Sequence, residues 1–398
     1  MVLGAIAGWL SKEQSALLWA YSVVGQLFLN ALTLVVVPLV ASSIIVGMAR
    51  LGRDDLVGRL GSKTFLAYFL TSLLAVGLGM AALLLVNPDP FLESAGQVSS
   101  LEKTVPPDGT PDGGLLVKFE EILYRMVPSN ILAVASQGQM LGLVLFSFVF
   151  GFLSSRIDAE PGLSIQNFFR GVFQIMMQAT HLVMRALPIG VFALMAKTAA
   201  ATGLEAVWSV AIFFAAVLAA LGCYVFIVMP LVLFFSGISP ISHFYAIFPA
   251  LVTAFSTSST AATLPITLEC MEKRANIPNR ICSFILPLGT TVNLSGTALY
   301  CSAAVIFIGQ AVGSPLDFPN LVVVAIMGLF SAFGMVAGIP SASVVTIVMI
   351  LQAVDLPVEA IAVIMPVERL LDMCRTTVNV YSNSCSASLT HRWMGADL

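Results

Sequence analysis

The sequence predicts an all-α polytopic membrane protein, and three observations lead to that fold class. Of the 398 residues, 58% are hydrophobic and only 10% are charged. The mean hydropathy is +0.97, whereas a soluble domain of this length needs far more charge to solvate its surface. Apolar stretches near the roughly 20 residues that cross a hydrocarbon core recur along the whole chain. The bilayer is therefore the expected solvent.

Charge and motif content exclude several other classes of protein. The net charge of -3 and the absence of Lys/Arg runs argue against a nucleic-acid partner. The six cysteines lack the paired spacing of a disulfide framework or a metal site, so the sequence predicts no cofactor. There is no HExxH, GxSxG or phosphate-loop motif, and His181, His243 and His391 are dispersed, so we expect no enzymatic activity.

The first half of the chain contains ordinary spanning segments. Residues Met1 to Ser11 are apolar but too short to cross, so we expect them to be the second half of a truncated first helix. A complete span is predicted for residues 23–49, which Pro38 interrupts, and the next for residues 64–86. Further spans are predicted at residues 131–153, 172–196 and 206–235.

A polar stretch and the cationic side chains set the expected orientation. Residues 87–118 are rich in Pro, Gly, Ser and Asp, which is typical of a solvated loop. Arginine and lysine cluster within residues 50–63 and 273–280, and the positive-inside rule places these connections in the cytoplasm. The 87–118 loop is then expected outside the cell.

Beyond about residue 240 the apolar segments are interrupted at membrane depth. Residues 243–272 are predicted to form a re-entrant helical hairpin, because the small and hydroxylated residues that follow Phe255, together with Pro265, force local unwinding. The alternative is a single kinked spanning helix whose Ser and Thr side chains form a packing face.

Two further breaks follow in the same half of the chain. One lies at residues 289–297, within the apolar stretch 281–312, and the other at residues 334–343, between two apolar arms that also suggest a hairpin. The N-termini of half-helices at such breaks offer free N–H groups to an anionic ligand. The sequence therefore predicts a site for a carboxylate in this region.

The last apolar segment carries ionisable side chains. Because such side chains cost free energy at membrane depth, their presence there suggests a specific role. Glu368, Asp372, Arg375 and Asn379 are spaced by four, three and four residues, so they share one stripe of a helix. One interpretation is an ion pair of Asp372 with Arg375 that only holds helices together. The other is a receptor in which the guanidinium binds a carboxylate and Asp372 holds an ammonium group, which suits an acidic amino acid.

These motifs resemble those of the glutamate transporter family, the dicarboxylate and amino-acid:cation symporters, and its prokaryotic members in particular. The matching segments are SSTAATLPIT at residues 258–267, NLSGTALY at 293–300, GIP at 338–340 and LDMCRTTVN at 371–379, with a weaker similarity at 188–194. Together they cover nearly the whole chain in the right order.

The resemblance implies a homotrimer in which a transport domain slides across the bilayer as an elevator, with two re-entrant hairpins. Residues 1–61 and 119–204 would be scaffold helices, the first of them truncated, and residues 87–118 an extracellular loop. The transport domain would comprise the helix 62–86 and residues 205–398. Its parts would be a helix, hairpin 1 (about 243–272), a broken helix (about 279–312), hairpin 2 (about 320–356) and a last helix (about 358–390).

Carried over by position, the resemblance assigns roles in a substrate pocket. Arg375 would bind the side-chain carboxylate of the substrate and Asp372 its amino group. Asn379, with the backbone around Thr260, would bind the α-carboxylate. The other lining residues would be Ser259, Thr297, Ile339, Ser343 and Thr376. Glutamate or aspartate is thus the expected substrate: Arg375 argues against the neutral amino-acid exchangers, which lack the cation there, and Asp372 argues against the dicarboxylate branch, which has no amino group to bind.

The positions that bind sodium in most family members are altered here. Ser295 and Asn383 stand where sodium-coupled members have Asp, and Phe333 stands where the second hairpin usually offers Ser. The other positions of these degraded sodium sites are Tyr68, Thr71, Ser72, Gly289, Asn293 and Asn379. Because a hard cation gains strongly from carboxylates, we expect sodium coupling to be weak or absent.

Proton coupling or substrate exchange is the expected replacement. Glu368 is the candidate proton carrier, since burial favours the protonated form of a carboxylate. The glutamate that follows the motif tyrosine in vertebrate members is Cys301 here, so that proton route is missing.

Alternatives remain at this point. The first is a sodium-coupled symporter of glutamate or aspartate, followed by a carrier of neutral amino acids or C4-dicarboxylates. A distant alternative is an anion channel, which also uses broken helices and charged rings. In each case we expect a multi-pass protein of the cell membrane whose partners are a small-molecule substrate, the lipid bilayer and two further copies of the chain.

Overall fold

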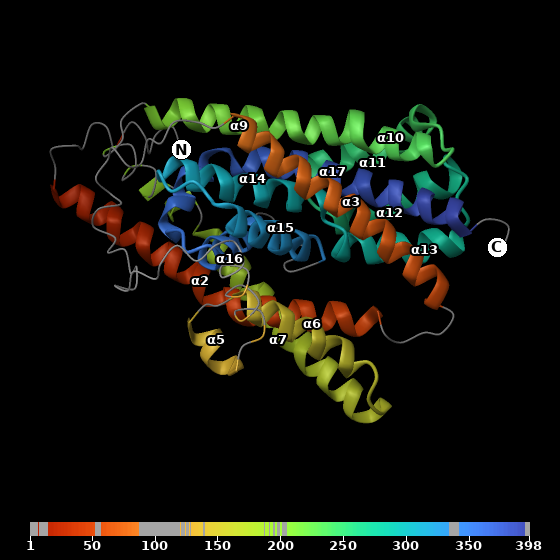
Figure 1. Cartoon of the computed structure of the whole chain (residues 1–398), viewed down its shortest axis with the longest axis horizontal. Coiled ribbons are helices and arrows are strands. Elements are labelled where there is room, and N and C mark those ends of the chain that lie inside the picture. Colours follow the sequence, from red (N-terminus) through yellow and green to blue (C-terminus); the bar gives the residue numbers. More distant parts are fainter. Residues whose placement is uncertain are drawn as a thin grey trace.

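The computed structural model describes helices that follow one another along almost the whole chain (Figure 1). The described residues are 7, 15–51, 57–86, 120, 124, 127, 129–137, 140–186, 188–190, 192, 193, 196, 200, 205–333 and 342–394. Within these ranges there is no strand, so the predicted all-α class is confirmed. The expected loop 87–118 and, apart from Ala7, the expected half-helix 1–11 lie outside them.

The first helices are α2 (Ser15–Leu51), α3 (Val57–Val86), α5 (Ile131–Gln137), α6 (Met140–Ser154), α7 (Ala159–Arg185) and α9 (Glu205–Cys223). A π-helical turn (Tyr224–Val228) joins α9 to α10 (Met229–Phe235). The remaining helices are α11 (Pro240–Thr257), α12 (Thr260–Lys273), α13 (Asn279–Val292), α14 (Ser295–Ala311), α15 (Phe318–Ala332), α16 (Ala342–Ala353) and α17 (Met365–Met394), which a 3-10 turn (Val358–Val363) precedes.

Three stretches of the described helices are long and apolar enough to cross a membrane: Leu60–Val86, Ser209–Phe235 and Asn279–Ala311. In the third, 94% of the most apolar window is buried inside the protein. Its hydrophobic side chains therefore face other helices, and this stretch, formed by α13 and α14, is a central element of the fold.

The helices pack in two groups, which Figure 1 shows on either side of the molecule. Helix α2 packs against α6 and α7, whereas α3 packs against α14, α15 and α17, and α16 contacts both groups. Very close helix contacts occur at glycines in each group. A Cβ on Gly79 of α3 would overlap the carbonyl oxygen of Leu299 in α14, and a Cβ on Gly151 of α6 would lie 2.7 Å from the carbonyl oxygen of Ile45 in α2.

Helix α7 differs most from the sequence prediction. A span was expected at residues 172–196, but the helix begins at Ala159 and ends at Arg185. Its first turns carry Glu160 and other polar residues on an exposed face, which lowers the hydropathy of any window without preventing helix formation. Hydropathy therefore located the apolar half of this amphipathic helix and missed the polar half.

Helices α11 and α12 pack against each other as a hairpin whose turn is two residues long. Ser258 ends α11 in the left-handed region at φ 51°. Ser259 is extended and caps α12, since its hydroxyl accepts a hydrogen bond from the amide of Ala262 at 3.2 Å. The predicted break is confirmed here, and the alternative of one kinked helix is wrong.

The second break separates α13 from α14 at Asn293 and Leu294. The amide of Leu294, which no helix satisfies, donates to the carbonyl of Ala332 at the end of α15 at 3.0 Å. The third predicted break, between α15 and α16, falls on residues 334–341, which lie outside the described ranges.

Candidate functional site

The ionisable stripe of α17 is buried in the protein. Glu368, Asp372 and Arg375 are 3%, 7% and 1% exposed, although they lie in a helix that the sequence placed at membrane depth. Helices α11, α12, α13 and α14 all pack against α17. The charges therefore face protein, as the cost of placing them in lipid requires.

One nitrogen of Arg375 is paired with both carboxylates of the stripe. Its Nη2 donates to Glu368 Oε1 at 2.8 Å and to Asp372 Oδ1 at 2.9 Å. The guanidinium carbon lies 4.1 Å from the ring centroid of Tyr300, so the ring of α14 covers one face of the cation. This contact fixes the plane of the guanidinium.

The other two nitrogens of Arg375 are buried donors. Nε and Nη1 have no hydrogen-bond partner among the described residues. These two N–H groups point to different sides of the guanidinium, because the edge that holds the Nε–H group is shared with Nη2, so each can donate a single hydrogen bond to a carboxylate. The ion pair with Asp372 and Glu368 thus occupies Nη2 and leaves two single donors of the cation.

Glu368 accepts hydrogen bonds from three different elements. Besides Arg375, Ser343 of α16 donates to Oε1 at 2.6 Å, and Tyr300 of α14 donates to Oε2 at 2.5 Å. Ser343 was expected to line the substrate pocket, and the structure places its hydroxyl on Glu368. The Glu368 carboxylate therefore links the start of α16 to the guanidinium of Arg375.

Asn379 lies one turn beyond Arg375 and binds the beginning of α14. Its Oδ1 accepts from the amides of Gly296 at 2.8 Å and Thr297 at 3.3 Å, and its Nδ2 donates to Thr297 Oγ1 at 3.1 Å. Gly296 permits this approach, because a Cβ there would lie 2.8 Å from the carbonyl oxygen of Arg375. Asn379 and Thr297 are thus brought together beside the cation.

The remaining predicted substrate residues lie at the hairpin and on α17. Thr260 begins α12 and donates to the carbonyl of Thr290 in α13 at 3.3 Å, while Ser259 caps the same helix. Thr376 is buried next to Arg375 on α17. Ile339 lies outside the described residues.

Most of the predicted sodium-site residues form a second polar cluster, between α3, the α13–α14 break and α17. Asn293 Oδ1 accepts from Ser295 at 2.8 Å, from Ser72 at 3.3 Å and from Thr71 at 3.4 Å. Its Nδ2 faces hydroxyls of Ser382 and Ser386. Among the described residues, no hydrogen-bond partner of Asn293 is a carboxylate, so these partners lack the negative charge that favours a hard cation.

Asn383 lies at the other end of the same cluster. A Cβ on Gly289 would lie 2.6 Å from Asn383 Oδ1 and 2.9 Å from Tyr68 Oη, so the three residues surround one small space. Asn383 Oδ1 is buried and lacks a partner within the described part of the chain. Phe333 packs its ring on Phe65, with centroids 5.1 Å apart, and supplies no oxygen.

The sequence prediction missed several residues of these clusters. Tyr300 was noticed only as the end of a motif, because a tyrosine in an apolar helix gives no sign of what its hydroxyl will bind. Tyr224, Ser382 and Ser386 join the Asn293 cluster, with Tyr224 Oη 3.2 Å from Ser382 Oγ. The spacing of the two serines along the stripe that contains Asn379 was the available signal.

Comparisons with known proteins agree with this geometry. The profile of the Sodium:dicarboxylate symporter family matches residues 1–393. The chain is 31% identical over 396 residues to the Proton/sodium-glutamate symport protein of Bacillus subtilis (strain 168), which covers 99% of this chain and 91% of that protein.

Two other relatives show how widely the similarity extends. The chain is 31% identical over 402 residues to the Proton/glutamate-aspartate symporter of Escherichia coli (strain K12), with 99% and 91% of the two chains covered. It is 30% identical over 441 residues to an Excitatory amino acid transporter of Caenorhabditis elegans, with 100% and 87% covered. This chain therefore belongs to the sodium:dicarboxylate symporter family and is a multi-pass membrane transport protein.

Proposed function

We propose that this chain is a secondary active transporter of glutamate or aspartate in the cell membrane, a carrier and not an enzyme. The two unpaired donors of Arg375 carry the proposal, because buried N–H groups of a permanent cation suit the side-chain carboxylate of the substrate. Asp372, 2.9 Å from the same residue, would hold the amino group. The names of the relatives, which are glutamate and aspartate symporters, support this substrate class.

The charges of the site favour coupling to a proton. Two carboxylates, Glu368 and Asp372, share the buried cation Arg375, and the exposed Arg369 lies 3.5 Å from Asp372. The buried part of this group carries one net negative charge when its three members are ionised. An acidic amino acid brings one more. Concentrating charge of one sign in a buried site is costly, so a cation that enters with the substrate offsets it. We assign that role to a proton on Glu368, whose three donors connect it to both α14 and α16.

Sodium is the weaker candidate for the coupling ion. The Asn293 and Asn383 clusters offer hydroxyl, amide and backbone oxygens, and none of the predicted sodium positions carries a carboxylate. Uncharged oxygen ligands, without a carboxylate, bind a monovalent cation weakly. The names of three relatives mention both proton and sodium, so the coupling ion is the part of the proposal that needs a direct test.

We further propose an elevator mechanism in a homotrimer. The packing of α2 with α6 and α7, and of α3 with α14, α15 and α17, supports a scaffold and a transport domain with the predicted limits of 1–61 and 119–204 for the former and 62–86 and 205–398 for the latter. All described substrate and ion residues belong to the second group, so they would move together as one body. The hairpin of α15 and α16 would serve as the outer gate.

Radiolabelled aspartate uptake into liposomes tests the proposal, with sodium and proton gradients imposed separately. We expect saturable uptake that an inward proton gradient accelerates and that a sodium gradient changes little. Uptake that requires sodium would overturn the coupling part and leave the substrate assignment. Unitary currents without saturable uptake would instead indicate a channel and overturn both.

A further inference from the structure

The start of α16 is hydrogen-bonded to the charged stripe of α17. Ser343 lies in the first turn of α16 and is 1% exposed, and its hydroxyl donates to Glu368 Oε1 at 2.6 Å. The helix itself, Ala342–Ala353, contains no ionisable side chain. A change of charge on Glu368 therefore acts on α16 most directly through this hydrogen bond.

Glu368 receives hydrogen bonds on both of its oxygens. Oε1 also accepts from Nη2 of Arg375 at 2.8 Å, while Oε2 accepts from Tyr300 at 2.5 Å. The charged and titratable side chains beside it are Arg369, Asp372 and Arg375 of α17 with Tyr300 and Cys301 of α14, and the 3-10 turn before α17 carries Glu359. The three donors come from three helices, so the carboxylate joins α14, α16 and α17 at one point.

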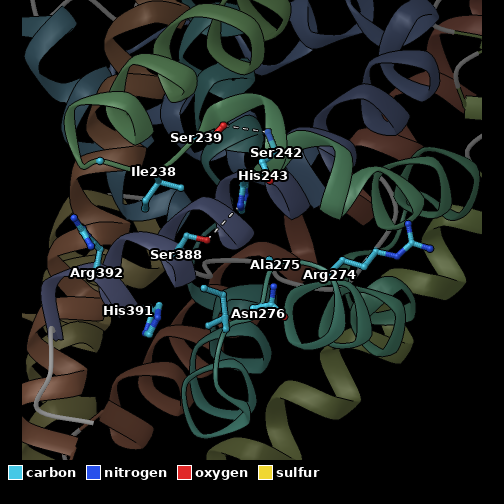
Figure 2. Close-up of a pocket in the computed structure, with 12 residues that line it drawn as sticks. Ile238, Ser239, Ser242, His243, Arg274, Ala275, Asn276, Ser388, His391 and Arg392 are labelled. Atoms are coloured by element: carbon cyan, nitrogen blue, oxygen red, sulfur yellow. Dashed lines mark hydrogen bonds between the residues drawn. The ribbon is translucent and has the colours of Figure 1, made fainter.

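This cluster is separate from the cavity that Figure 2 shows near the end of α17. That cavity, of about 510 Å³, is lined by residues such as Ser388 and His391, and by neither Glu368 nor Ser343. Glu368 and Ser343 are 3% and 1% exposed. A proton therefore reaches Glu368 only when a neighbouring element moves, and α16 is the neighbour that belongs to the proposed outer gate.

The strength of the Ser343 bond depends on the charge of Glu368. A hydrogen bond to an ionised carboxylate is roughly twice as strong as one between neutral groups. A proton on Oε2, toward Tyr300, would leave Oε1 as an acceptor for Ser343 but without its negative charge. The start of α16 is thus held firmly while Glu368 is ionised and more weakly once it is protonated.

We propose that Ser343 makes closure of the α15–α16 hairpin depend on the proton of Glu368. This inference rests on the proposed function, in which that hairpin is the outer gate and Glu368 carries the coupling proton. Ser343 is a positioning residue here, because it acts through Glu368 and needs no contact with the substrate.

The dependence accounts for coupling in three states of the carrier. When the carrier is empty and Glu368 is ionised, the Ser343 bond closes the hairpin, so the empty carrier can return across the membrane. When only a proton is bound, the bond is weak and the hairpin stays open, so the proton does not cross alone. When aspartate is also bound, its own contacts close the hairpin.

The test compares two transport modes of the full chain reconstituted in liposomes. Net uptake of labelled aspartate under a proton gradient requires return of the empty carrier, whereas substrate exchange against internal unlabelled aspartate does not. In Ser343→Ala the ratio of net uptake to substrate exchange should fall roughly tenfold, because the empty carrier loses one charge-assisted hydrogen bond that favours its closed state.

The matched control is Ser331→Ala, which removes a hydroxyl from the other arm of the same hairpin. Ser331 is 2% exposed, and its hydroxyl donates to the carbonyl of Gly328 in its own helix at 2.6 Å. This variant loses a buried hydrogen bond without touching Glu368. It should keep the wild-type ratio.

Hydrogen–deuterium exchange provides a second readout that needs no transport. The substrate-free protein is measured in nanodiscs at one mildly alkaline pH, and the peptides that contain Ala342–Ala353 are followed. Deuterium uptake should be faster in Ser343→Ala and in Glu368→Gln than in the wild type. The double variant should be no faster than the single ones, because both substitutions weaken the same contact.

A lower transport ratio together with faster, non-additive deuterium uptake in α16 supports the inference. An unchanged ratio or unchanged deuterium uptake in Ser343→Ala overturns it and leaves the proposed transporter in place, as does a wild type that exchanges substrate without net uptake. A wild type that neither accumulates nor exchanges aspartate overturns the proposed function, and this inference with it.

Discussion

Replacing Glu368 by Gln removes one negative charge from the site and changes its shape little. Oε1 of Glu368 accepts from Arg375 and Ser343, and Oε2 accepts from Tyr300. In the variant the amide oxygen can keep the first two bonds while the amide nitrogen turns toward Tyr300. The tyrosine hydroxyl can accept as well as donate, so it accepts from the amide over a longer contact than the present 2.5 Å, while its own proton loses the acceptor that Glu368 supplied.

The expected cost to stability is therefore moderate. The bonds from Arg375 and Ser343 go to a neutral oxygen instead of a carboxylate, and the bond from Tyr300 is lost as it stands, which together costs about 2–4 kcal/mol in the free energy of unfolding. Arg375 keeps Asp372 at 2.9 Å, so no buried cation is left unpaired. The variant should fold, and a change in transport then reports on the lost proton.

The assay is the pH dependence of aspartate binding and uptake. If one proton enters with each substrate, the Kd of the wild type rises up to about tenfold for each pH unit. Binding is thus tighter at low pH. In Glu368→Gln the Kd for aspartate should not change between about pH 5.5 and about pH 8. A proton gradient should also no longer drive the accumulation of aspartate.

The control is Glu359→Gln, the same substitution in the 3-10 turn before α17. It should keep the wild-type pH dependence. If Glu368→Gln also keeps it, the assignment of Glu368 as the proton carrier is refuted, whatever the effect on the rate of transport.

Three other predictions follow from the described contacts. Arg375→Cys removes both carboxylate-binding donors, so the affinity for aspartate should fall roughly 100-fold or more and uptake of small neutral amino acids should appear; retained aspartate binding in calorimetry would contradict the pocket. Ser295→Asp combined with Asn383→Asp restores two carboxylates to the ion clusters, so sodium should stimulate aspartate uptake; uptake that stays independent of sodium would count against the role given to these positions. Gly79→Ala forces a methyl group into the backbone of α14 and should lower the free energy of unfolding by about 1–3 kcal/mol, whereas Gly77→Ala, whose Cβ would meet nothing within 4 Å, should lower the unfolding midpoint much less.

The helix breaks could be read from the sequence because they depend on local chemistry. The serines at 258 and 259 supply the left-handed residue and the cap that a two-residue turn needs. The length of α7 could not be predicted in the same way, since the cost of exposing its polar first turns depends on what surrounds them.

The stripe of Glu368, Asp372, Arg375 and Asn379 was equally determined by the sequence. A helix repeats every 3.6 residues, so four polar residues at those spacings must share a face, and their charge forces that face away from lipid. The sequence did not determine which atoms pair within the stripe. Each guanidinium nitrogen has several potential partners, and these lie far apart in the chain.

The tertiary structure decided those pairings. It placed Tyr300 over Arg375 and Ser343 on Glu368, and it turned the Asn293 side chain toward hydroxyl groups of α3, α14 and α17. Such contacts join residues that are distant in the sequence, as between Thr71 and Asn293, which lie 222 positions apart. Sequence by itself fixes what a segment must bury and where it must bend, since those depend on neighbours along the chain. The position of a hydrogen-bond partner depends on how whole helices pack, and only the folded chain brings those atoms within reach.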